Sequence, residues 1–82
     1  MRPDESVHDA IRRLVSEEHT LRANHTARVG DPAAQVERLQ EVEVELDQCW
    51  DLLRQRRALR TTGADPDTAD VRPASLVERY LQ

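Results

Sequence analysis

The spacing of apolar residues constrains the fold most, because they recur every three or four positions in two separate stretches. The first stretch runs from Glu5 to about Thr26, and the second runs from Pro32 to about Arg60. Such spacing places apolar side chains along one side of an α-helix. The sequence therefore predicts two long amphipathic helices, at 5–26 and 32–60.

The segment between these stretches, RVGDPAAQ at 28–35, carries the signals of a helix end followed by a helix start. Gly30 suits the end of the first helix, Asp31 can cap the second, and Pro32 is tolerated in a first helical turn. Because the connection is short, the two helices are expected to pack antiparallel as a hairpin. On that geometry the second helix overhangs its partner beyond about Leu53.

The sequence beyond the second helix, TTGADPDTAD and its continuation over 61–72, is rich in turn-forming residues. It is expected to form an exposed loop. Residues 73–81 begin with a proline and contain four apolar residues, which indicates a short C-terminal helix. The whole chain, 1–82, is thus predicted to be a single all-α domain: an antiparallel two-helix hairpin with a short C-terminal helical segment.

A chain of 82 residues can build only a small core, and its single cysteine permits no intramolecular disulfide. Two helices rarely bury enough apolar surface alone, and the apolar stripe on the second helix is wider than one partner needs. We therefore predict a homodimer in which two hairpins form a four-helix bundle packed like a coiled coil. The expected core or dimer-interface residues are Ile11, Leu14, Leu21, Leu39, Leu46, Cys49, Trp50 and Leu53.

The charge balance and the absence of long apolar runs narrow the class of protein. A net charge of −4 argues against nucleic acid as a general partner, because phosphate-binding domains usually carry excess positive charge. No stretch approaches the length of a membrane span, and the acidic N-terminal stretch has no apolar segment of a signal peptide. A cytoplasmic protein without a membrane partner is expected.

Several residue groups could suggest catalysis or metal binding. Glu5 and His8 match the Glu-x-x-His spacing of di-iron bundles, but such a site needs paired motifs from four helices. Cys49 lies mid-helix without a nearby cation, so a buried, inert thiol is favoured. Asp47 and Asp51, with Arg54 on the same helix face, are expected to form salt bridges within the helix or across the dimer rather than an acid–base pair. No catalytic residue, metal site or cofactor is predicted, and a metal-binding bundle is kept as a third possibility.

The best functional candidate is the arginine cluster near the end of the second helix, which consists of Arg54, Arg56, Arg57 and Arg60. Positive charge at a helix C-terminus is favourable by itself, and Glu78, the loop aspartates or a partner subunit could neutralise it. Clustered guanidinium groups can instead bind carboxylates or phosphates in a bidentate manner. The leading hypothesis is a non-enzymatic module that binds another protein. The alternative is a site for an anion, a nucleotide or nucleic acid.

Four sequence blocks suggest a known family: EEHTLR at 17–22, VELDQCWDLLRQRRA at 44–58, DPD at 65–67, and VRP followed by VERYL within 71–81. In this order they resemble the actinobacterial domain-of-unknown-function family 2630. The central block is the specific one, whereas the connection between the helices looks individual to this chain. The resemblance implies a small cytosolic protein and supplies no activity.

Overall fold

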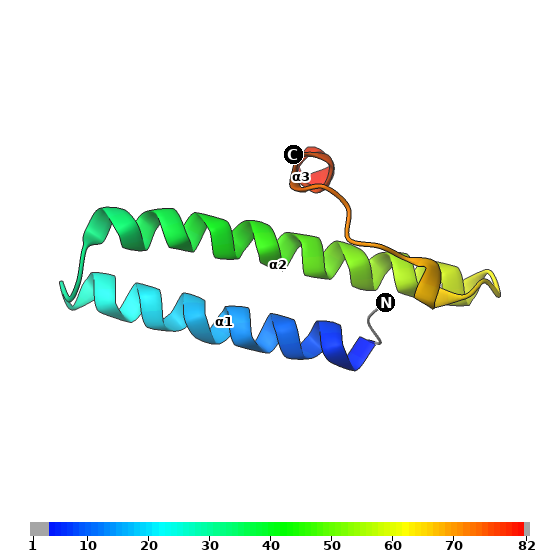
Figure 1. The fold of residues 1–82 in the computed structure, drawn as a ribbon, viewed down its shortest axis with the longest axis horizontal. Coiled ribbons are helices and arrows are strands. Elements are labelled where there is room, and N and C mark those ends of the chain that lie inside the picture. The colour runs from blue at the N-terminus through cyan, green and yellow to red at the C-terminus, as the bar shows by residue number, and fades with distance from the viewer. Residues whose placement is uncertain (1–3, 82) are drawn as a thin grey trace.

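The computed structural model describes the backbone of residues 4–81 and the side chains of residues 4–78. It contains two long helices, α1 (Asp4–Thr26) and α2 (Pro32–Thr61), a 3-10 turn, η1 (Pro66–Thr68), and a short helix, α3 (Ala74–Leu81). The predicted all-α fold with an antiparallel hairpin is confirmed (Figure 1). Each helix lies within one residue of its predicted range, whereas η1 falls inside the predicted loop.

The turn between α1 and α2 is built from the residues that the sequence singled out. Arg28 and Gly30 have positive φ angles of 58° and 86°, which reverse the chain within a few residues. Asp31 caps α2, because its carboxylate accepts a hydrogen bond of 3.1 Å from the amide of Ala33. Pro32 occupies the first turn of α2, where it needs no hydrogen-bond partner.

The apolar core lies near the end of the hairpin farthest from this turn. Val7 and Ile11 of α1 meet Leu52 of α2, and Ala69 from the loop after η1 closes the cluster. The predicted loop is therefore anchored at this point rather than exposed throughout. Partly buried residues surround the cluster, namely Leu46, Cys49, Leu53 and Leu59.

Helix α2 lies between α1 and α3 and packs against both of them (Figure 1). Within the described residues, α1 and α3 have no contact with each other. The last turns of α2 extend beyond the start of α1, as predicted (Figure 1). The side chains of Arg56 and Arg60 nevertheless reach back to Asp4 in the first turn of α1, so these two arginines do not project freely from the overhang.

Val42 is fully buried on α2 and provides a test of the hairpin packing. We expect Val42→Ala to lower the free energy of unfolding by about 2 kcal/mol, because two carbons leave a closely packed site. Val29→Ala is the matched control, since Val29 is 57% exposed in the turn. It should change stability by less than about 0.5 kcal/mol in the same urea titration. Equal losses in the two variants would contradict the packing described above.

Candidate functional site

The arginine cluster divides into an internal half and an exposed half. Arg56 is only 4% exposed. Its Nε donates to the Asp4 carboxylate, and its Nη1 donates to the Asp67 carboxylate at 3.0 Å and to the Pro66 carbonyl at 3.1 Å. Arg60 lies 2.8 Å from the other oxygen of Asp4. These two arginines are thus neutralised within the chain, partly by a loop aspartate as one hypothesis proposed.

No local sequence pattern indicates Asp4 as a partner of the cluster, because it lies at the other end of the sequence. Hydrogen bonds from Arg60 and then from Arg56 lower the pKa of Asp4 below its ordinary value. The carboxylate therefore stays ionised and bridges two arginines one helical turn apart. This bridge joins the first turn of α1 to the last turns of α2.

Arg54 and Arg57 form the exposed half of the cluster. Within the part of the chain whose side chains are described, neither has an ion pair. They follow Trp50 by four and seven positions, so all three side chains share one side of α2. Trp50 itself is 46% exposed. This surface combines a large apolar group with two cations.

The eight predicted core or interface residues occupy different environments. Ile11 is buried and Trp50 is exposed. The remaining six are half-buried along the hairpin, namely Leu14, Leu21, Leu39, Leu46, Cys49 and Leu53. The apolar stripe is therefore only partly covered by the single chain.

Asp51 holds the C-terminal segment on α2, a role that the sequence did not indicate. Asp51 is 1% exposed. Its carboxylate accepts two hydrogen bonds from Arg72, one from Nε at 2.8 Å and one from Nη2. Gln55 also donates to this carboxylate at 2.9 Å. The bonds from Arg72 in particular lower the pKa of Asp51. The principal partner of Asp51 thus lies beyond the loop, rather than on α2 or on another subunit as expected.

Two glutamines extend this attachment to the main chain. Gln48 donates to the carbonyl of Arg72 at 3.1 Å, and Gln55 donates to the carbonyl of Asp70 at 2.9 Å. Gln48, Asp51 and Gln55 follow one another at spacings of three and four, so they form a polar strip along one side of α2. The polar strip holds residues 70–72 on α2 through these hydrogen bonds.

Helix α3 continues from this attachment and places Glu78 against Asp47 of α2. The two carboxyl groups are hydrogen-bonded to each other, and this bond, together with burial, raises the pKa of Glu78. Oε1 of Glu78 is buried without a hydrogen-bond partner among the described residues. A pair of this kind requires a proton, in contrast to the ion pairs elsewhere on α2.

The middle of the hairpin carries a second set of ion pairs. Arg38 of α2 forms a fork with Glu17 of α1, with contacts of 2.6 Å from Nε and 2.9 Å from Nη2. This fork lowers the pKa of Glu17. Arg22 of α1 contacts Glu43 of α2 at 3.1 Å and Glu18 at 3.4 Å. Arg22 thus links α1 to α2 and also pairs with Glu18 of its own helix.

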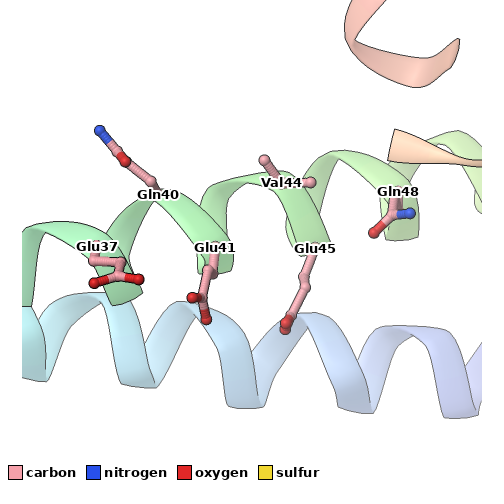
Figure 2. A pocket seen from close by; sticks show the side chains of 6 residues that line it. All are labelled: Glu37, Gln40, Glu41, Val44, Glu45 and Gln48. Atoms are coloured by element: carbon pink, nitrogen blue, oxygen red, sulfur yellow. The ribbon is translucent and has the colours of Figure 1, made fainter. Parts of the chain in front are cut away.

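A shallow groove of about 490 Å³ is lined by residues of α2 between Glu37 and Gln48 (Figure 2). Gln40 and Val44 project away from α1, whereas Glu41 and Glu45 point toward it (Figure 2). Arg38 contacts both Glu41 and Glu45, at 3.0 and 3.5 Å. The groove is therefore a partly neutralised acidic surface.

Neither a metal-binding group nor a membrane-spanning helix is found among the described residues. No three histidine, cysteine or acidic side chains in this part of the chain meet in a way that could hold a metal ion. None of the described helices is long and apolar enough to cross a membrane. Cys49 is half-buried and lines a small cavity together with Ala10, Leu14 and Val71.

The attachment through Asp51 predicts unequal effects of removing its two partners. Arg72→Ala leaves a buried carboxylate with one amide donor, so we expect a loss of about 3 kcal/mol in the free energy of unfolding. Asp51→Ala should cost less, about 1.5 kcal/mol, because the Arg72 side chain is already 33% exposed and can turn into water. Urea titrations of both variants and of the double variant measure the difference. Equal single losses that add in the double variant would contradict this pairing.

Comparison with known proteins places the chain in a family. The family model described as "Protein of unknown function (DUF2630)" matches residues 3–82. The uncharacterized proteins Rv0898c of Mycobacterium tuberculosis and Mb0922c of Mycobacterium bovis are each 56% identical to it over 70 residues, which cover 85% of this chain and 80% of theirs. No solved structure matches the chain. The family resemblance expected from the four sequence blocks is confirmed, and the chain belongs to the DUF2630 family.

Proposed function

We propose that this chain is a non-enzymatic, homodimeric protein-interaction module. The observation that supports the proposal is an apolar side of the hairpin that the chain itself leaves uncovered. We call it the open face, and it consists of Val15, Val36, Leu39 and Trp50. The first, second and fourth of these are among the exposed large apolar residues, and Leu39 is half-buried.

The open face spans both long helices. Val15 lies seven positions before Arg22, which places both on one side of α1. Glu43 lies seven positions after Val36 and seven before Trp50, which places these three on one side of α2. Because Arg22 and Glu43 form an ion pair of 3.1 Å, these two sides adjoin. The uncovered apolar residues therefore share one side of the hairpin.

The geometry of the open face favours a second copy of the chain as its partner. Residues 70–72 attach to the polar strip, and Val36 and Trp50 stay exposed on this side of α2. Near the turn, Leu21, Val36 and Leu39 line a groove of about 300 Å³ that could receive apolar side chains. Two open faces related by a two-fold axis would bury each other and complete a four-helix bundle. Trp50 would be the central anchor, since tryptophan is enriched at interface hot spots.

Light scattering tests the dimer. At micromolar concentration we expect about twice the 9.4 kDa mass of one chain. Trp50→Glu should give the mass of one chain while keeping its helical circular dichroism, because a charge on the open face would be buried on association. Val29→Glu, at a similarly exposed position in the turn, is the control and should remain dimeric. A wild-type mass near 9.4 kDa would refute the proposal.

Anion binding through the exposed half of the arginine cluster is a second candidate function. It is supported by the exposure of Arg54 and Arg57, and it is weakened by the ion pairs that occupy Arg56 and Arg60. Two exposed guanidinium groups could still bind a phosphate or an acidic peptide.

A thermal-shift panel of inorganic phosphate, nucleotides and a short oligonucleotide would test this second function. Binding should weaken with salt and disappear in the Arg54→Glu, Arg57→Glu double variant, because these charges would supply the affinity. Arg12→Glu, Arg13→Glu is the control, since these arginines are exposed on α1. Absence of any shift, or equal loss in the control, would exclude this candidate.

A further inference from the structure

The contact between α3 and α2 combines a fully buried apolar side chain with two carboxyl groups. Val77 of α3 is completely buried. The next residue, Glu78, meets Asp47 of α2, and Oε1 of Glu78 is buried without a hydrogen-bond partner among the described residues. Burial of Val77 therefore forces two acidic groups together at the same contact.

Two carboxyl groups can share a hydrogen bond only while one of them carries a proton. When both are ionised, the hydrogen bond is lost, two like charges face each other, and a charged oxygen lies out of water. Among the described side chains, no cation forms an ion pair with either Asp47 or Glu78 that could compensate. Loss of the proton therefore makes the docking of α3 on α2 energetically unfavourable.

The other charged groups near this contact already have partners or lie apart. Among the described residues, α3 packs against α2 and against no other helix. One turn before Asp47, Glu43 pairs with Arg22, and one turn after it, Asp51 pairs with Arg72. Arg54 lies two turns after Asp47 and acts on the Asp51 carboxylate. Glu78 and Asp47 thus face each other as the unneutralised groups of the described contact.

We propose that α3 is a proton-dependent latch, which stays on α2 while Asp47 and Glu78 share a proton and releases when both are ionised. Release would be local, because Arg72 and the carbonyl of Asp70 are bound separately by the polar strip. The chain between residues 72 and 74 would then act as the hinge. Opening exposes Val77 and the part of α2 that it covers, so the latch governs a second apolar surface.

The direction of the pH dependence follows from the raised pKa of Glu78 in the docked state. In the released state this carboxyl group titrates near its ordinary value of 4.5. The docked state therefore holds a proton over a pH range in which the released state has lost it. Docking is strongest below about pH 4.5 and weakens as the pH rises through the raised pKa.

Hydrogen exchange of the α3 amides in the full chain, corrected for the intrinsic pH dependence of exchange, tests the latch. Between about pH 4.5 and about pH 8 we expect wild-type protection over residues 74–81 to fall, because the shared proton is lost in this range. Protection of the α1 and α2 amides should not fall in parallel. Unchanged α3 protection over this range would overturn the proposal.

Glu78→Gln separates the proton from the rest of the contact. The glutamine amide can donate to the ionised Asp47 carboxylate without a bound proton, so α3 should stay protected at neutral pH and lose its pH dependence. Glu37→Gln, which removes an exposed carboxylate elsewhere on α2, should behave like the wild type. Equal α3 protection in Glu78→Gln and the wild type at neutral pH would overturn the proposal. Since Glu78→Gln is expected to leave light-scattering masses unchanged, failure of the latch is distinguishable from failure of the dimer.

Discussion

The buried guanidinium of Arg56 is the interaction on which the arrangement of the chain depends. It joins the first turn of α1, through Asp4, to η1, through Asp67 and the carbonyl of Pro66. A buried cation without such partners would destabilise the fold by several kcal/mol. Arginine suits this position because its planar group presents five donors in fixed directions, which a lysine ammonium does not. A single side chain therefore connects the start of α1, the end of α2 and the loop that follows it.

Helix α2 supports the rest of the molecule on two sides. One side carries the apolar contacts with α1, and the other carries the polar strip that binds residues 70–72. The contact with α1 depends mainly on the hydrophobic effect, whereas the contact with residues 70–72 depends mainly on charge-assisted hydrogen bonds. Since α1 and α3 have no contact within the described residues, a change at α3 can leave the hairpin intact.

The sequence predicted the parts of the fold that depend on local rules. Apolar spacing located α1 and α2, and Asp31 and Pro32 correctly marked the start of α2. The same cap signal, an aspartate followed by proline, occurs at Asp65 and Pro66 and could have indicated η1. These features are readable because each depends on residues that lie within a few positions of one another.

The buried charges could not be predicted in the same way. Arg56 lies 52 positions from Asp4 and Asp51 lies 21 from Arg72, and no periodic pattern connects such pairs. A charged residue is buried only when its partner arrives, so burial is a property of the tertiary fold. Trp50 shows a different limit of the sequence. An apolar pattern indicates that a side chain is expected to be buried, but it does not show whether the same chain or a second copy buries it. Its role at a dimer interface stays a prediction.

The turn at Arg28 and Gly30 contributes nothing to the buried core, which lies at the opposite end of the hairpin. The alignment of the two helices is held instead by Arg38 with Glu17 and by Arg56 with Asp4. Extra residues in this connection would therefore lengthen an exposed loop at a small entropic cost and leave the pairing of the helices unchanged. This connection can therefore differ in length and in sequence while the packing of α1 against α2 stays the same.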